Sequence, residues 1–401
     1  MSGGNIHTAL HSLALEAMLG DGDLLGVEVL GVEFAVRWGR EVTREQRDAM
    51  RWAWARCASS RGPLSPPLPM EPTDGEPFSA SVTHQPRAKD VRTFTLQAAT
   101  FEELAENLTS RLTVAAILAN AGELMMLHAC GVADPVTGAV VALVAKSGTG
   151  KTTAASVLAR TYGYVTDETV AIGPDGSVIP YPKPLSVKQG SGIPKRQVGP
   201  DEFGLEPAPV NPFIQSIVLL DRVRSDRPVT PVLQRVPLAD AVLSLIPDSS
   251  SQGEIEEPLQ SLCRLIDSVG GVWQVTYSEA ADLPAALKPM FRTQPGTQSE
   301  WEPRVVAGTQ SGHIPNGCVR RAIPKDAVAI GGDLLVMLDN EIVRVSGIGP
   351  AIWEASANPV RLDQLAEEVG NMHGRPEGYR DAVAAAAEQL IAKSVLDQGR
   401  T

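Results

Sequence analysis

The apolar residues fall into short runs and helical periods that alternate along most of the chain. Short apolar runs predict buried strands, and apolar residues three and four positions apart predict helices. By these criteria, strands are predicted at 91–96, 125–132, 139–144, 164–166, 170–172, 178–179 and 214–220. Helices are predicted at 44–57, 153–160 and 238–246, and one or two helices at 101–120. Strands that alternate with helices in this way favour an α/β fold.

A turn sequence separates two of the predicted strands. Residues 134–138 read Asp-Pro-Val-Thr-Gly and lie between the runs at 125–132 and 139–144. Aspartate, proline and glycine are typical of tight turns, so the two runs are expected to pair antiparallel. The central sheet is therefore predicted to be mixed rather than purely parallel.

The C-terminal part has a different pattern, in which short strands precede helices. Strands are predicted at 327–330, 334–338 and 342–345, and helices at 348–355, 362–369 and 379–393. This order is typical of a small winged-helix-like α+β domain. The polar stretch at 291–317 precedes it, and its length favours a linker. The predicted parts are an N-terminal α/β extension at 1–100, a central domain at 101–290, a linker at 291–321 and a C-terminal domain at 322–401.

Composition and charge narrow the class of protein. The 401 residues are 43% hydrophobic and 20% charged, as in ordinary globular proteins, and carry a net charge of −12. Such an acidic chain is a poor partner for nucleic acid. No apolar run approaches the roughly 20 residues that span a bilayer, no secretory signal is apparent, and the four cysteines are widely spaced. We expect a cytoplasmic protein without nucleic-acid or membrane partners, and the sequence leaves its oligomeric state open.

The most specific motif is AKSGTGKT at 145–152, a phosphate-binding loop (P-loop) between a predicted strand and a predicted helix. Its glycines allow a tight turn in which backbone N–H groups and the helix dipole face phosphate oxygens. Lys151 is placed to reach the β- and γ-phosphates of ATP, and Thr152 to bind Mg²⁺. Ala145 replaces the first glycine, which predicts a distorted start of the loop or weaker nucleotide binding. The residues expected to bind the nucleotide are Ser147, Gly148, Thr149, Gly150, Lys151, Thr152 and Thr153.

Three further side chains are candidates for chemistry beside the phosphates. Asp167 and Glu168 follow the strand at 164–166, which places them at the carboxyl edge of the sheet. Asp167 could hold Mg²⁺ or accept the proton of an attacking hydroxyl, with Glu168 as a second metal ligand. The alternative for this pair is a helix N-cap or a surface turn. His128 lies among apolar residues, where a histidine is either a core residue or a functional one.

Together these residues resemble the catalytic domain of HPr kinase/phosphorylase and its relatives, over roughly residues 110–250. The shared pattern is a histidine before the P-loop strand, the loop, an acidic pair on the next strand, and the segment PKPLSVK at 182–188. The resemblance implies the nucleotide-binding fold of phosphoenolpyruvate carboxykinase. It also implies phosphorylation of a hydroxyl, often of serine, that requires ATP and Mg²⁺.

Residue by residue, the resemblance places His128 and Asp167 in the catalytic positions and Lys151 and Thr152 in the nucleotide and metal positions. Lys151, Asp167 and His128 are therefore the candidate catalytic residues, and Thr152, Asp167 and Glu168 the candidate metal ligands. Three residues depart from the family pattern, and the first is Ala145 in the P-loop. Glu168 replaces a second aspartate, and Lys183 stands where relatives tend to have arginine, so the bidentate fork suited to phosphate is lost.

The C-terminal part resembles the PqqD family of peptide chaperones. The resemblance rests on LLVMLDNE at 334–341 and GIGPAIWE at 347–354, where short strands precede a helix with an Ile-Trp pair. It implies binding of the leader peptide of a ribosomally made, modified peptide by strand addition at a sheet edge. We expect the run at 327–330 to be that outer strand, because it is the first of the domain. A plain winged-helix interaction domain is the alternative.

The leading hypothesis is an ATP-dependent kinase, a transferase whose C-terminal domain delivers a peptide hydroxyl to the phosphoryl-transfer site. Tethering an acceptor near the site would raise its local concentration. One alternative is a non-catalytic ATP-binding scaffold for the peptide chaperone. The other is a kinase that acts on a small molecule, either free serine or a sugar.

Overall fold

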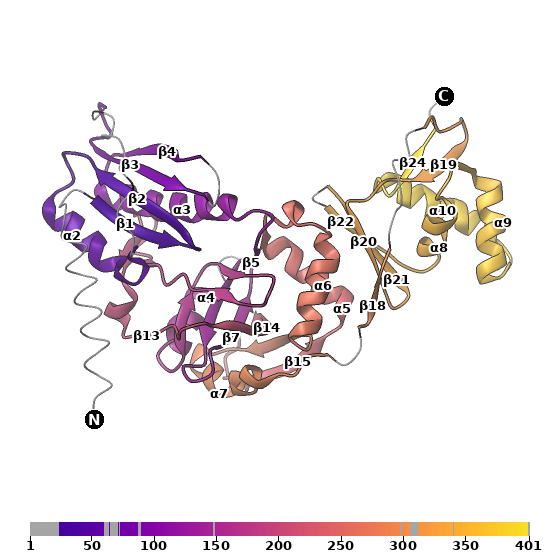
Figure 1. The fold of residues 1–401 in the computed structure, drawn as a ribbon. Coiled ribbons are helices and arrows are strands. Elements are labelled where there is room, and N and C mark those ends of the chain that lie inside the picture. The colour runs from indigo at the N-terminus through magenta and orange to yellow at the C-terminus, as the bar shows by residue number, and fades with distance from the viewer. Residues whose placement is uncertain are drawn as a thin grey trace. The chain divides into compact units, whose positions relative to one another are not determined.

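A computed structural model describes residues 24–59, 64, 71, 73–86, 90–146, 149–296, 299–304, 312–339 and 341–399. The chain divides into two compact units (Figure 1). The first unit comprises Met1–Gln234, Asp248–Ser251 and Trp273–Thr293. The second unit comprises Arg235–Pro247, Gln252–Val272 and Gln294–Thr401.

The first unit begins with an antiparallel sheet in the order β1-β2-β3-β4. Its strands are β1 (Leu24–Val29), β2 (Val32–Trp38), β3 (Phe78–Gln85) and β4 (Arg92–Ala98). The turn between β1 and β2 consists of Leu30 and Gly31, both with positive φ, as a two-residue hairpin requires. Helix α2 (Arg44–Ala53) follows β2 and begins at a capping box between Thr43 and Gln46.

Helix α3 (Phe101–Ala119) closes the core of this sheet. Thr100 caps its N-terminus by accepting a hydrogen bond from the backbone N–H of Glu103. Leu104, Leu108 and Leu112 recur at every fourth position and are fully buried in the same core as the strands. Each fully buried leucine side chain contributes about 1.5–3 kcal/mol. Sequence periodicity thus predicts α3 to within one residue.

A seven-stranded sheet forms the centre of the first unit, in the order β13-β8-β6-β7-β14-β17-β15. Strand β6 pairs antiparallel with β7 and with β8, whereas β7 and β14 are parallel. The sheet is therefore mixed, and the predicted turn at 134–138 does join two antiparallel strands, as its sequence indicates. These strands are β6 (Ala129–Ala133), β7 (Ala139–Val144), β8 (Gly163–Thr166), β13 (Glu206–Pro207), β14 (Phe213–Arg222), β15 (Val232–Val236) and β17 (Val272–Tyr277).

The run predicted as one strand at 125–132 is interrupted at His128. Residues before it form β5 (Met125–Leu127), which belongs to a separate small sheet in the order β10-β9-β5-β16. The backbone N–H of His128 donates to the carbonyl of Asp248 at 2.6 Å, so the chain leaves one sheet here and enters the other. In this sheet β5 pairs with β9 (Val170–Ile172) and β16 (Ser249–Ser250), and β10 (Val178–Ile179) pairs with β9. A hairpin of β11 (Leu185–Val187) and β12 (Arg196–Val198) lies elsewhere in this unit.

Helix α4 (Lys151–Leu158) follows β7 and packs its buried residues into the core of the seven-stranded sheet. The same core contains α7 (Leu283–Leu287) and the rings of Tyr162 and Phe291, which stack with centroids 4.3 Å apart. Phe291 therefore belongs to this core, although the polar character of the following residues places it in the predicted linker.

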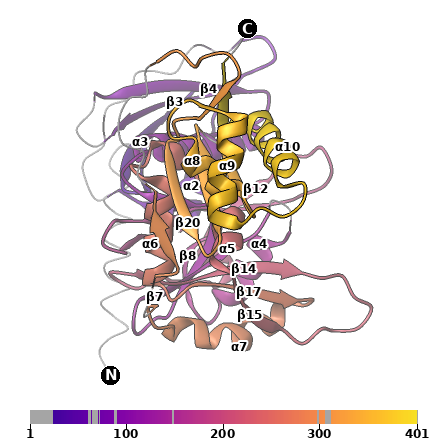
Figure 2. The same cartoon turned by 90° about the vertical axis from the view of Figure 1, so that its right-hand side faces the viewer.

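The second unit contains a four-stranded antiparallel sheet in the order β18-β20-β21-β22 and a three-stranded one in the order β23-β19-β24. Its strands are β18 (Trp301–Pro303), β19 (Cys318–Arg321), β20 (Asp326–Ile330), β21 (Asp333–Leu338), β22 (Glu341–Val345), β23 (Val360–Arg361) and β24 (Leu396–Gln398). Its helices are α5 (Leu238–Leu245), α6 (Pro258–Ser268), α8 (Gly349–Ala355), α9 (Leu362–His373) and α10 (Tyr379–Ala392). Helices α9 and α10 lie side by side, as Figure 2 shows.

Helix α6 is tied to the C-terminal strands by one carboxylate. The buried side chain of Asp326 accepts hydrogen bonds from the backbone N–H groups of Leu259 and Gln260 at 2.8 and 3.0 Å. The side-chain amide of Gln260 donates to the same carboxylate at 2.9 Å. Asp326 thus satisfies N–H groups at the start of α6, where no local side chain caps the helix. The C-terminal strands consequently form one compact unit together with 252–272.

Two expectations about the C-terminal half need correction. The run at 327–330 is not an outer strand, because β20 pairs with β18 on one side and β21 on the other. The predicted linker at 291–321 contains β18 and β19, and its residues 297–298 and 305–311 lie outside the described residues. The compact units therefore also differ from the predicted domain boundaries.

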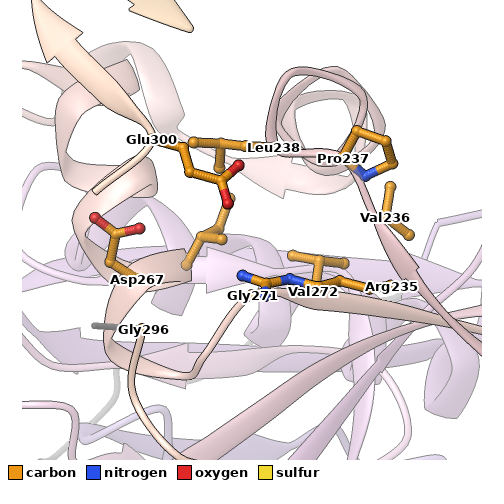
Figure 3. A pocket seen from close by; sticks show the side chains of 10 residues that line it. Arg235, Val236, Pro237, Leu238, Asp267, Gly271, Val272, Gly296 and Glu300 are labelled. Carbon is orange, nitrogen blue, oxygen red and sulfur yellow. The ribbon is translucent and has the colours of Figure 1, made fainter. Parts of the chain in front are cut away.

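A cavity of about 250 Å³ lies in the second unit (Figure 3). Apolar residues and glycines line it together with Arg235, Asp267 and Glu300. Asp267 accepts hydrogen bonds from the Ser299 hydroxyl at 2.7 Å and the Trp301 indole at 2.8 Å, which attach the start of β18 to the end of α6. None of the residues that the sequence singles out for chemistry lines this cavity.

Across the described residues, no helix is long and apolar enough to cross a membrane.

Candidate active site

The candidate site lies at one edge of the seven-stranded sheet. Strands β7 and β8 both pair antiparallel with β6, so they run in the same direction and end at the same edge. Strand β14 is parallel to β7 and ends there as well. The P-loop follows β7 and Asp167 follows β8, while His128 immediately precedes β6, which runs the opposite way. Sheet topology therefore brings together the predicted residues from three places between residues 128 and 168.

In the described part of the predicted P-loop, the backbone conformation fits the residue types present. Gly150 has φ 102° and directly precedes α4, a conformation that glycine adopts at little cost. The hydroxyl of Thr149 donates to the carbonyl of Lys146 at 2.6 Å, and Thr153 is exposed on α4. The predicted nucleotide-binding residues Ser147 and Gly148 lie outside the described residues.

Ala145 causes no strain at the start of the loop. The φ angle of Ala145 is not positive. Its backbone therefore does not need the conformational freedom that glycine provides. Its side chain is buried in the core beside α4. The distortion predicted from the missing glycine is not found.

Lys151 is the first residue of α4 and is only 8% exposed. Its ammonium group donates a hydrogen bond to the carbonyl of Ala145, across the loop. Burial lowers the pKa of Lys151, and the negative charges of Asp248 and Glu168 oppose that shift. The ammonium group thus lies against the loop that the sequence assigns to phosphates.

Asp167 has two oxygens with different environments. Its Oδ2 accepts a hydrogen bond from the hydroxyl of Thr152 at 3.2 Å, on the side of the P-loop. Its Oδ1 accepts one from the buried hydroxyl of Tyr164 at 3.0 Å. Burial, and then the charge of Asp167, raises the pKa of Tyr164 well above its usual value, which keeps that hydroxyl a donor. Asp167 is itself 7% exposed, so it is not part of a surface turn.

Lys183 forms a buried ion-pair network with both acidic residues. Its ammonium group lies 3.0 Å from Asp167 Oδ1 and 3.2 Å from Glu168 Oε2, and its side chain is 3% exposed. Burial alone would lower the pKa of Lys183, but the charges and hydrogen bonds of the two carboxylates outweigh it and raise that pKa above its usual value. One cation is thus shared by two adjacent carboxylates. In the sequence, Lys183 stands out only as a substitute for arginine, and no local pattern indicates its role.

The charges of Lys151 and Glu168 both affect the pKa of His128. Burial lowers the pKa of His128 below its usual value, the charge of Lys151 lowers it further, and Glu168 and Asp248 oppose the shift. The imidazole is therefore biased toward its neutral form, as a proton acceptor requires. Asp248, which interacts with both His128 and Lys151, carries no signal in the sequence because it lies 120 residues further along the chain, at the end of a short 3-10 helix after α5.

The donors around Asp167 fit a magnesium ion bound together with phosphates. Mg²⁺ prefers hard oxygen ligands and commonly uses one or two carboxylates, a hydroxyl and substrate phosphate oxygens. Thr152 and Asp167 provide a hydroxyl and a carboxylate within hydrogen-bond distance of each other. The second predicted ligand, Glu168, has its carboxylate paired with Lys183. No group of three or more histidine, cysteine, aspartate or glutamate residues suited to a metal occurs in the described parts of the chain.

Comparisons with known proteins give no family assignment. No family model matches the chain, and no curated protein is similar to it in sequence. Among solved structures, the Hpr(Ser) kinase/phosphatase from Coxiella burnetii matches with 15% identity over 42% of this chain and 88% of the other. The TM-score of that match is 0.21, so it carries no argument about fold or function.

Proposed function

We propose that the first unit transfers the γ-phosphoryl group of ATP to a hydroxyl acceptor, with Mg²⁺ as cofactor. The observation that carries this proposal is the hydrogen bond between Thr152 and Asp167 at 3.2 Å, which joins the end of β8 to the start of the P-loop helix. A hydroxyl and a carboxylate at this junction are the side chains that P-loop enzymes use for Mg²⁺. Lys151, the residue directly before Thr152 in the first turn of α4, supplies the cation for phosphates.

Each residue has a role that follows from its surroundings. Lys151 would exchange its bond to the Ala145 carbonyl for phosphate oxygens. Thr152 and Asp167 Oδ2 would hold Mg²⁺, which neutralises charge on the phosphates when it is bound. Tyr164 and Lys183 hold the other oxygen of Asp167 and so fix the carboxylate plane. Glu168, which is more exposed, and the neutral His128 are the groups available to accept the acceptor's proton.

The acceptor we propose is a serine hydroxyl on a ribosomally made peptide, which the second unit recruits. Support comes from the outer strand β22, which has β21 on one side only in the described sheet. A peptide could add to this edge through backbone hydrogen bonds. Because β20 is internal, β22 replaces residues 327–330 as the proposed strand to which the peptide adds.

The test is phosphate transfer by the full-length protein. Protein and Mg²⁺-ATP are incubated with a synthetic serine-containing peptide, with free serine or with a sugar, and mass spectrometry detects an added phosphate. We expect transfer by the wild type and a loss of at least about 100-fold in Asp167→Asn, the range for a positioned acid–base or metal-binding group. Asp175→Asn, an exposed aspartate in a turn, is the matched control and should be fully active.

Three outcomes separate this proposal from its alternatives. Transfer to free serine or a sugar but not to the peptide would favour a small-molecule kinase. Tight ATP binding without transfer to any acceptor would favour a scaffold. Equal transfer by wild type and Asp167→Asn would remove Asp167 from the reaction.

A further inference from the structure

Arg222 lies at the same edge of the sheet as the P-loop, although no sequence motif marks it. It is the last residue of β14, the strand parallel to β7. In the register of this pair, Leu219 is opposite Val144, the last residue of β7. Arg222 therefore extends three residues beyond the level at which β7 ends and the P-loop begins.

The side chain of Arg222 reaches the end of the loop at Gly150. A Cβ atom placed on Gly150 would lie 3.6 Å from Arg222 Nη1. Gly150 is the residue before Lys151, at the start of α4. The guanidinium group therefore approaches the backbone whose N–H groups, in a P-loop, face the phosphates.

A single hydrogen bond holds the guanidinium in this place. Its Nε donates to the carbonyl of Ser278 at 3.1 Å, just after β17. The ends of β14 and β17 are joined beside it, because the N–H of Val223 donates to the carbonyl of Tyr277 at 2.8 Å. With Nε occupied, the two terminal nitrogens of the fork remain available for a ligand.

Arg222 has no carboxylate partner among the described residues. The neighbouring carboxylate of Asp221 accepts hydrogen bonds from Gln274 and Thr276, at 3.2 and 2.9 Å, and no ion pair to Arg222 is found in the described chain. An exposed guanidinium that is oriented by a carbonyl and lacks an acidic partner is suited to an anionic ligand. Planar N–H pairs of arginine match phosphate oxygens especially well.

We propose that Arg222 is a second cationic ligand of the nucleotide's phosphate chain, beside Gly150 at the start of α4. This inference rests on the proposed function, since it needs a nucleotide at the P-loop. Arg222 gives the site a guanidinium fork for phosphate. Lys183 has no such fork, and its ammonium group is buried against Asp167 and Glu168. Lys151 and Arg222 thus bind phosphate, and Lys183 orients the acidic residues.

The test compares Mg²⁺-ATP affinity of full-length variants by calorimetry at about 0.15 M salt, where the Debye length is about 8 Å and distant charges are screened. Arg222→Gln should weaken binding about 10- to 100-fold, the range for a charge-assisted hydrogen bond. Arg222→Lys should lose less, because it keeps the charge but not the fork. Arg224→Gln is the matched control: this exposed arginine lies two residues further on, and its variant should bind within about twofold of wild type.

The variants also distinguish the failure of this inference from that of the proposed function. Binding that is lost in Lys151→Ala but unchanged in Arg222→Gln would overturn the role of Arg222 alone. An equal loss in Arg222→Gln and Arg224→Gln would also overturn it, since it would indicate a general field rather than a contact. If the wild type binds no ATP, the proposed function fails and this inference fails with it. The ligand-free melting temperature of each variant provides the check on folding.

Discussion

Replacing Lys183 by methionine tests the ion-pair network at the candidate site. The ammonium group lies 3.0 Å from Asp167 and 3.2 Å from Glu168, and the side chains of Lys183 and Asp167 are only 3% and 5% exposed. Methionine has similar bulk and no charge, so the variant keeps the packing and leaves Asp167 as a buried carboxylate without its cation. Removing one partner of a buried pair costs about 3–5 kcal/mol. Such a loss would be a large part of a typical unfolding free energy of about 5–15 kcal/mol.

The assay is urea-induced unfolding of the full-length protein, followed by circular dichroism. Lys195→Met is the matched control, because Lys195 pairs with Glu106 at a similar distance of 3.1 Å but its side chain is 44% exposed. Screening by solvent limits that pair to about 0–1 kcal/mol. Lys183→Met should therefore lower the unfolding midpoint clearly, and Lys195→Met should barely change it.

A double variant isolates the electrostatic part of the loss. Asn at position 167 removes the uncompensated charge, so Lys183→Met/Asp167→Asn should be more stable than Lys183→Met alone. The reasoning is refuted if Lys183→Met stays within about 0.5 kcal/mol of the wild type. It is also refuted if the double variant loses the sum of the two single losses.

Two further predictions concern other parts of the molecule. Asp326→Ala should destabilise the second unit by about 2–3 kcal/mol, because it leaves the buried N–H groups of Leu259 and Gln260 without partners. Faster hydrogen exchange of the amides of α6 would reveal this loss. Unchanged protection of α6 would contradict the role of Asp326 as its cap. The lowered pKa of His128 means that folding disfavours its protonated form, so stability should fall as pH drops below about 6.5, the usual pKa of an unfolded histidine. His128→Gln should reduce this acid sensitivity, and His84, whose pKa burial also lowers, should contribute to what is left. An unchanged pH profile in His128→Gln would show that His128 does not contribute.

Sequence pattern predicts the strands and helices whose residues carry the signal locally. Strand β7 is fully buried and continuously apolar, and its predicted and observed bounds coincide. The run before it also reads as one strand, but it is broken at His128 by a bond to Asp248, far away in the sequence. Helix α6 went unpredicted, and its N-terminus is satisfied by Asp326 rather than by a neighbouring cap residue. Such tertiary partners leave no local pattern.

The same distinction applies to the C-terminal sheet and the candidate site. Strand β18 is short and polar, so its sequence indicates a linker, yet its backbone pairs with β20 and makes that strand internal. At the site, the P-loop and the acidic pair have recognisable spacings in the sequence. The ion pair of Lys183 and the position of Arg222 depend on the order of strands in the sheet, which local patterns do not contain.

The most direct test of the central claim is calorimetric titration of Mg²⁺-ATP into the wild type, Lys151→Ala and Ala145→Gly. The account predicts saturable, Mg²⁺-dependent binding to the wild type and a loss of at least about tenfold in Lys151→Ala, since the ammonium group at the start of α4 is removed. Ala145→Gly should bind like the wild type, because Ala145 has no positive φ. Equal affinity of the wild type and Lys151→Ala, or no binding by either protein, would contradict the assignment of 145–152 as a phosphate-binding loop.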